Sequence, residues 1–269
     1  MMVKVRLIFS LAIFSILTLS GCDKSNDKIL PYQDSTSGDS QSMKINLYRF
    51  DRDFNKVVNE FLKDELHNFS HGHKSLFSSY LNIRDATSKE IADAYSANQI
   101  DGDLNFYKKN IRITGRLASI NSGIGNEPYL VFSDGGFNRP QAKLAEGLIP
   151  EAAALKKNQQ VTLVCIGAGS IMGSPMLSDC NFADHVGNFA RGKIIREIED
   201  FAKGDSASKV SVQIAVVSET IAKLIDDDMG CPDECMREMA KKVSFENSSE
   251  VRKSMASGGL KMGENFFKD

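Results

Sequence analysis

The sequence predicts an α+β chain in which a small barrel of five β-strands lies between two helical segments. Three observations lead to this fold class. Apolar residues recur at three- and four-residue steps before residue 100 and again after residue 187, which is the period of an amphipathic helix. Between these parts they alternate with polar residues, as is typical of half-buried strands. A short helix is predicted between the third and the fourth strand.

The first 22 residues, MMVKVRLIFSLAIFSILTLSGC, have the features of a secretory signal. Lys4 and Arg6 give a positive start, and an apolar run of about 13 residues leads to small residues before Cys22. That run is shorter than the ~20 residues that a membrane-spanning helix needs. The ending LSGC resembles the lipobox of bacterial lipoproteins. The resemblance implies that Cys22 becomes a lipid-modified N-terminus carrying acyl chains such as palmitate.

This lipid anchor would hold the protein in the cell envelope, facing the periplasm, and the sequence leaves open whether the inner or the outer membrane carries it. Residues 23–42 are rich in Ser, Asp, Gly and Gln and contain few apolar side chains. Such a composition does not support a packed core. We therefore expect a flexible tether between the anchor and the folded part.

Two helices are predicted before the barrel. An apolar stripe from Phe54 to Leu66 predicts an amphipathic helix over residues 51–68. The sequence Thr87-Ser88-Lys89-Glu90 fits a capping box, in which the Thr caps the helix and the Glu three residues later reaches back to it. This motif predicts a second helix over residues 88–98.

The strand pattern begins with residues 111–120, where apolar and polar side chains alternate. Four more strands are predicted at 129–133, 139–144, 160–166 and 176–181, and Pro150 begins a short helix over 150–157. Five strands with a helix between the third and the fourth is the order of the OB-fold, a small Greek-key barrel. The sequence therefore predicts an OB-fold barrel with helical segments on both sides.

The C-terminal part is predicted to be helical. Apolar residues mark one helix around 189–198 and another around 214–225, and Pro232 lies near the start of a third over 231–241. The glycine-rich tail from Ser257 onward is expected to be loosely ordered. The predicted organisation is a signal peptide (1–22), a tether (23–42), a helical segment (43–85), an OB-fold domain (86–185) and a helical C-terminal region (186–269).

The stretch VTLVCIGAGSIMGSPMLSDC, residues 161–180, allows two interpretations. Its glycines are similar to a dinucleotide-binding fingerprint, but such a loop lies between a strand and a helix of a βαβ unit. Here Ser174, Pro175 and a second alternating run follow instead. We therefore interpret the stretch as an antiparallel hairpin, which can place Cys165 opposite Cys180.

Four cysteines remain when the lipid-modified one is set aside, and an exported chain meets an oxidising compartment. Four cysteines allow three pairings, and the sequence alone does not choose among them. Proximity favours Cys165 with Cys180 and Cys231 with Cys235.

The run ATSKEIADAYSANQIDGDLNFYKKNIRITGRLAS, residues 86–119, closely resembles the start of the domain shared by bacterial OB-fold lipoproteins of the tRNA_anti-like family. The matching motif residues are Ala94, Tyr95, Asn98, Asp103, Tyr107 and Lys108, with Val164, Cys165, Leu177, Asp179 and Cys180 on the last two strands. The resemblance covers roughly residues 86–182. It implies an OB-fold, and the family name records a fold likeness to anticodon-binding domains rather than an activity on tRNA.

Three histidines in HNFSHGH, namely His67, His71 and His73, could be metal ligands, with His185 or Glu65 completing the set. The alternative is a solvated helix end with ordinary histidines, and we favour it.

Two further patterns suggest chemistry. Ser206 and Lys209 have the S-x-x-K spacing of serine hydrolases such as the penicillin-binding enzymes, but the companion S-D-N and K-T-G elements are absent from the sequence. Cys231 and Cys235 are one residue too far apart for a C-x-x-C redox pair, which favours a structural disulfide. We predict no catalytic residue, no metal and no cofactor.

We expect the barrel to be a non-catalytic binding or interaction module, with its ligand site at Tyr129, Arg139 and Lys143 on the second and third strands. This position follows from analogy with other OB-folds. The expected partner is an envelope protein, a glycan or a small ligand. One alternative is a metal-dependent or hydrolytic envelope enzyme that uses the helical regions.

A second alternative is binding of single-stranded nucleic acid by the OB-fold. The chain has 33 Lys and Arg against 35 Asp and Glu, which argues against a general attraction to phosphates. Tyr129 and Phe132 have opposite parity on their strand, so they cannot form one stacking platform. We therefore do not expect nucleic acid as the partner.

Overall fold

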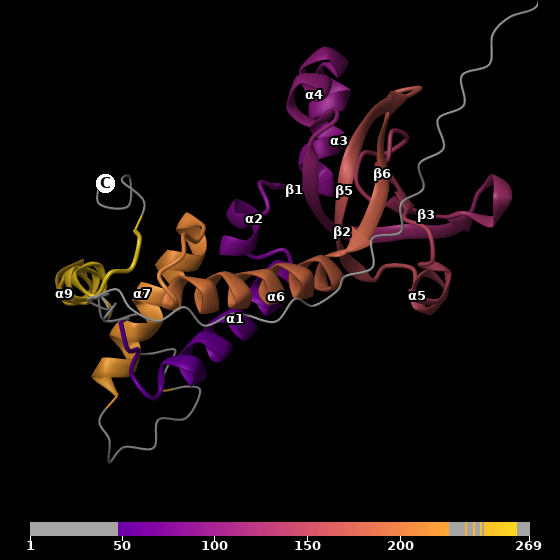
Figure 1. Ribbon diagram of the computed structural model, residues 1–269. Coiled ribbons are helices and arrows are strands. Elements are labelled where there is room, and N and C mark those ends of the chain that lie inside the picture. Colours follow the sequence, from indigo (N-terminus) through magenta and orange to yellow (C-terminus); the bar gives the residue numbers. More distant parts are fainter. Residues whose placement is uncertain (1–47, 226–234, 236–238, 240–242, 244, 263–269) are drawn as a thin grey trace, which may run out of the picture. The chain divides into compact units, whose positions relative to one another are not determined.

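A computed structural model describes residues 48–225 and 245–262, together with Cys235, Met239 and Val243 (Figure 1). The predicted signal peptide and tether, the predicted helix over 231–241 apart from two of its residues, and the end of the tail lie outside the described residues.

Five strands close into a barrel. They are β2 (Asn110–Ser122), β3 (Pro128–Phe132), β4 (Gln141–Leu144), β5 (Gln160–Ile171) and β6 (Ser174–Phe182). Their order is β2-β3-β4-β6-β5, and β5 pairs with β2 to close the barrel. Only β4 and β6 are parallel neighbours in this ring, and α5 (Ile149–Ala154) connects β4 to β5. This confirms the predicted α+β class and the OB-fold.

Apolar side chains at alternating positions of the strands fill the interior of the barrel. Leu130 and Phe132 of β3 are fully buried, and they pack with Ile113 of β2 and Leu163 of β5 in one apolar cluster. The residues between them point away from this cluster, as the period of two requires. The barrel therefore has its own core.

A second core lies among the helices. It is formed by α1 (Phe54–Ser70), α2 (Leu76–Tyr80), α6 (Ala183–Ala202), α7 (Lys209–Leu224) and α9 (Phe245–Ser257). The predicted stripe of α1 is confirmed, because Phe54, Val57 and Leu62 are buried against α6 and α7. Gly187 lets α6 approach α1 closely, since a Cβ there would lie 2.6 Å from the Leu66 side chain.

Two elements that the sequence did not predict, a short strand and a short helix, lie beside the barrel on either side of a predicted helix in the chain. The short strand β1 (Arg84–Thr87) pairs in parallel with the first half of β2. The capping box then starts α3 (Ser88–Ala97), as predicted. The Asn98 side chain caps α4 (Gln99–Phe106) directly afterwards by accepting hydrogen bonds from the Ile100 and Asp101 amides.

The hairpin of β5 and β6 carries the disulfide between Cys165 and Cys180, with the two Cα atoms 4.1 Å apart. The hairpin interpretation of residues 161–180 is thereby confirmed, and Ile171 pairs with Ser174 across its turn. Cys235 is also disulfide-bonded, while Cys231 lies outside the described residues.

Arg112 of β2 joins the barrel to the end of α1. Its side chain is only 2% exposed. Its Nη1 donates to the Phe69 carbonyl at 2.8 Å, its Nη2 to the His73 carbonyl at 2.7 Å, and its Nε to the Asp85 carboxylate at 2.7 Å. The guanidinium also lies 4.7 Å from the centre of the Phe69 ring. A buried cation is tolerated because each of these nitrogens has a partner.

Replacing both bridging cysteines, as Cys165→Ala with Cys180→Ala, is expected to lower the free energy of unfolding by about 3 kcal/mol, because the bridge closes a loop of 15 residues in the unfolded chain. Denaturant unfolding of the non-reduced protein measures the loss. A Cys235→Ala variant separates the contribution of the other disulfide. Unchanged stability of the double variant would contradict the role given to the bridge.

Replacing Arg112 by Met is expected to lower the free energy of unfolding by about 2–4 kcal/mol, since the buried Phe69 carbonyl, the His73 carbonyl and the Asp85 carboxylate each lose a charged donor. Thermal unfolding followed by circular dichroism measures it. Arg116→Met is the matched control, because Arg116 is exposed on the same strand and donates only to the Asn158 carbonyl. Equal losses in the two variants would show that the partners of Arg112 contribute nothing specific.

Candidate functional site

A cavity of about 240 Å³ lies on the outer face of the barrel. Three strands and one loop line it with Gly123, Glu127, Tyr129, Gln141, Lys143 and Met176. The first two residues belong to the connection between β2 and β3, and the others to β3, β4 and β6. A pocket with an apolar floor and a few polar groups is the usual form of a small-ligand site.

Strand register brings two of the predicted site residues together. Tyr129 of β3 is the register partner of Lys143 of β4, so both side chains leave the barrel on the same face. The neighbouring Leu130 points into the core instead. The Tyr129 ring packs close to Gly123, where a Cβ would lie 3.6 Å from it.

The two charges of the pocket neutralise each other. Lys143 Nζ lies 2.6 Å from the Glu127 carboxylate, and about half of each side chain is exposed. The hydrogen bond to Glu127 raises the pKa of Lys143 above its ordinary value. The pocket therefore offers a charge-balanced rim rather than a free cation.

Arg139, the third predicted site residue, does not line the cavity. It is exposed in the connection between β3 and β4, because β4 begins at Gln141 and not at residue 139 as predicted. The reason is Pro140, which has no N–H for the ladder. Its carbonyl instead accepts a hydrogen bond from the Phe132 amide.

Four lining residues were not found from the sequence. Met176 and Gln141 meet because β6 runs parallel to β4, with these two residues in register. Glu127 and Gly123 are placed by the turn between β2 and β3, where the Gly123 amide donates to the Glu127 carbonyl. None of the four belongs to a motif, so only the fold assembles them.

The sequence profile of the tRNA_anti-like family matches residues 1–181, which is more than half of the chain. The chain belongs to the tRNA_anti-like family. Among solved structures it is similar to a lipoprotein from Klebsiella pneumoniae subsp. pneumoniae MGH 78578 that is described as a candidate nucleic acid-binding protein. The identity is 14%, the match covers 39% of this chain and 94% of the other, and the TM-score is 0.33. A likeness at this level supports no functional argument.

No curated protein matches this tRNA_anti-like chain. Within the described residues, no helix is both long enough and apolar enough to cross a membrane.

The predicted histidines of this family member lie at and beyond the end of α1. The rings of His67 and His71 stack with centres 4.1 Å apart, while His73 follows the helix and uses its carbonyl to bind Arg112. Glu65 accepts hydrogen bonds from the hydroxyl of Ser75 and the amide of Leu76, both at 2.7 Å.

The fifth candidate ligand, His185, packs edge-on against the Phe182 ring at the start of α6. In the part of the chain that the structure describes, no three His, Cys, Asp or Glu side chains form a group that could hold a metal ion. The predicted histidines are therefore not assembled with Glu65 or His185 into one cluster.

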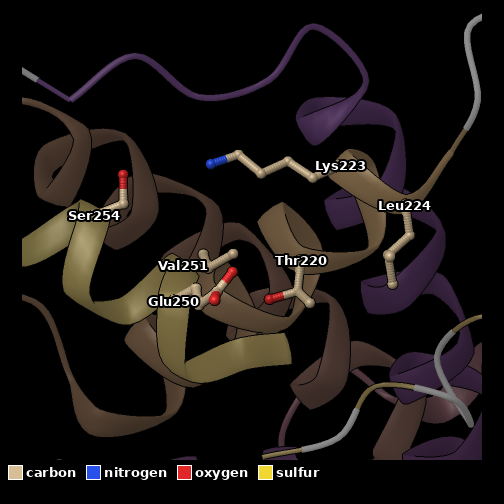
Figure 2. Close-up of a pocket in the computed structure, with 6 residues that line it drawn as sticks. All are labelled: Thr220, Lys223, Leu224, Glu250, Val251 and Ser254. Carbon is tan, nitrogen blue, oxygen red and sulfur yellow. The ribbon is translucent and has the colours of Figure 1, made fainter. Parts of the chain in front are cut away.

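A second cavity, of about 300 Å³, lies between α7 and α9. Figure 2 shows its lining residues, which are Thr220, Lys223, Leu224, Glu250, Val251 and Ser254. Lys223 donates to the Tyr48 hydroxyl at 2.7 Å and pairs with Glu219 at 3.2 Å. Glu219 is fully buried and also binds the Tyr48 hydroxyl and the Asp51 amide. The Lys223 ammonium is thus engaged in holding the start of the described chain.

The S-x-x-K residues do not share a helical turn. Ser206 precedes α7 in an exposed connection, and Lys209 is the first residue of the helix. The polar contacts here involve Glu197 of α6 instead. Its carboxylate accepts hydrogen bonds from the Ser211 and Tyr80 hydroxyls, both at 2.7 Å, and from the Ser208 amide at 3.2 Å.

Because of this network, the contribution of Glu197 to the stability of the helical bundle depends on pH. Burial raises the pKa of Glu197, but the hydrogen bonds from Ser208, Tyr80 and Ser211 outweigh it and hold the pKa below its ordinary value. A carboxyl group with a lowered pKa stabilises the fold above its unfolded-state pKa, and the contribution is lost as the pH falls through the folded-state value.

We expect Glu197→Gln to be less stable than the wild type at neutral pH and the difference to shrink as the pH is lowered below about 4.5, the ordinary value of Glu. Denaturant unfolding across this pH range measures both proteins. Glu199→Gln, at an exposed position of α6, serves as the control. A stability difference that does not change with pH would contradict the prediction.

Proposed function

We propose that this tRNA_anti-like chain is a cell-envelope lipoprotein, anchored to a membrane at Cys22 and facing the periplasm, whose barrel binds its partner without catalysing a reaction. The cavity on the outer face of β3, β4 and β6 carries the proposal, because it combines an aromatic ring, a thioether and hydrogen-bonding groups in one concave site. The signal features and the lipobox-like LSGC support the envelope location.

The chemistry of the cavity favours an uncharged or internally balanced ligand. The Glu127 carboxylate already neutralises Lys143, while Gln141 can donate and accept and Tyr129 offers a ring face. An envelope glycan or an exposed loop of an envelope protein presents hydroxyl, amide and apolar groups of this kind.

Nucleic acid is less well supported as the ligand. Stacking platforms use several aromatic rings beside free cations, whereas Tyr129 is the aromatic residue of this cavity and Phe132 is buried in the core. For the enzyme alternative, the S-x-x-K residues do not share a helical turn, and the candidate histidines form no metal-binding cluster among the described residues. We therefore keep the binding module as the proposed function.

Photocrosslinking in living cells tests the site. A photoreactive residue in place of Met176, on the β6 side of the cavity, is expected to capture a discrete partner. Tyr129→Ala in the same protein is expected to abolish that capture, because the ring forms the opposite wall. The matched control position is Arg116, which is exposed on the barrel away from the cavity.

Capture that survives Tyr129→Ala, or equal capture from position 116, would contradict this site. Two further readouts address the rest of the proposal. Cys22→Ser should release the protein from the membrane fraction. Fluorescence anisotropy with a labelled single-stranded oligonucleotide should show no binding, and tight, salt-dependent binding would favour the nucleic-acid alternative.

A further inference from the structure

The short helix α4 presents an apolar stripe to solvent. Ile100, Leu104 and Tyr107 follow one another at steps of four and three residues, so they lie on one side of the helix. Their exposed fractions are 74%, 70% and 45%. The opposite side, with Gly102 and Phe106, is buried. The stripe is therefore not the side by which α4 packs on the barrel.

The hairpin of β5 and β6 lies beside α4 and carries exposed apolar residues of its own. At Gly169, a Cβ would lie 3.6 Å from the Tyr107 ring, which places the end of β5 beside α4. Ile171, the last residue of β5, is 62% exposed, and Met172 in the turn that follows is 96% exposed. Figure 1 shows α4 and this hairpin tip at the same end of the barrel.

Three exposed cations lie around α4, two beside the stripe and one, Arg84, over the Phe106 ring on the other side of the helix at 4.7 Å. Lys108 Nζ lies 5.1 Å from the centre of the Tyr107 ring, and Lys109 Nζ donates to the Leu104 carbonyl at 2.7 Å. Arg84 of β1 donates to the Asn105 side chain at 3.0 Å.

Two carboxylates of α4 lie near these cations, and each accepts a hydrogen bond from a neutral donor, which leaves its negative charge in place. Asp101 accepts from Asn105, and Asp103 accepts from Tyr95. An apolar stripe with lysines at its border is the composition of surfaces that rest on anionic lipid headgroups.

The proposed anchor brings such a surface within reach. From Cys22 to Tyr48 the chain has 26 residue steps, and at up to ~3.5 Å each they can span about 90 Å. The longest described helix, α6, has 20 residues and is about 30 Å long. A connection of this length allows any surface of the folded part to face the membrane. The surface that meets the lipid is therefore chosen by its own chemistry.

We infer that α4 and the tip of the β5–β6 hairpin, with Arg84, Lys108 and Lys109 at their border, dock on the anionic phospholipid surface to which the chain is anchored. The inference rests on the anchored location proposed above. Docking inserts the stripe among the headgroups and gives the barrel a fixed orientation on the membrane.

The chain contains no tryptophan, so Leu104→Trp introduces a single fluorescent reporter into the stripe. The matched control is Phe189→Trp, because Phe189 is 62% exposed on α6, away from α4. The full lipid-modified chain is reconstituted in vesicles of phosphatidylethanolamine and phosphatidylglycerol with brominated acyl chains. We expect strong quenching and a blue shift for Leu104→Trp and little change for Phe189→Trp.

The charges are tested in the same system. Lys108→Ala with Lys109→Ala is expected to lower the ratio of docked to undocked protein by roughly tenfold or more, since each cation near an anionic surface contributes to docking. Exchanging phosphatidylglycerol for phosphatidylcholine should have a similar effect.

Three outcomes would overturn the docking proposal. In the first, the protein floats with the vesicles but the two tryptophan reporters are quenched equally, or the quenching is unchanged by the lysine substitutions and by the lipid exchange. Lipid docking is then wrong, while the proposed anchor is retained. If the Leu104→Trp reporter responds only when envelope proteins are added, the stripe binds a protein instead. If the chain does not float with the vesicles at all, the proposed anchor fails and docking fails with it.

Discussion

The buried guanidinium of Arg112 is the interaction on which the arrangement of the barrel beside α1 depends. It extends from the first barrel strand and binds the end of α1, the segment after that helix and the strand β1. A cation without partners would be costly at this depth, so the partners have to be held in place together. The aromatic face of Phe69 completes the enclosure. Barrel and helices each have a core, and this residue connects the two.

Regular patterns made most of the fold predictable. Stripes identified α1, α6 and α7, and alternation identified the five barrel strands, because burial on one face leaves a period in the sequence. The strand β1 left no such signal, since its four residues, RDAT, are mostly exposed and polar. The helix α4 was missed because it contains Gly102 and carries apolar residues on both its buried and its exposed side.

The candidate site was predictable only where neighbouring strands define it. Analogy with other OB-folds suggested Tyr129 and Lys143, and the structure places these two on one face because β3 and β4 are adjacent and antiparallel. Arg139 was assigned to the same face by extending the strand through Pro140, which has no N–H to donate to the ladder. Met176 comes from a strand that is distant in sequence and parallel to β4, and no local pattern reports such a pairing. The barrel thus has one surface built around a neutralised pair, and beside it α4 carries an exposed apolar stripe near Lys108 and Lys109.

Glu219 gives the molecule a defined path for mechanical load. Any pull along the chain from the N-terminus reaches the described structure at Tyr48, whose hydroxyl is bound to Glu219 and Lys223 in the middle and at the end of α7. The Asp51 amide adds a second attachment to the same buried carboxylate. Force is therefore delivered to the helical core before it acts on α1, and it reaches the barrel by way of the helices. If a partner holds the barrel at its outer face, as proposed, tension on the anchored chain passes through the helical core before it reaches that face.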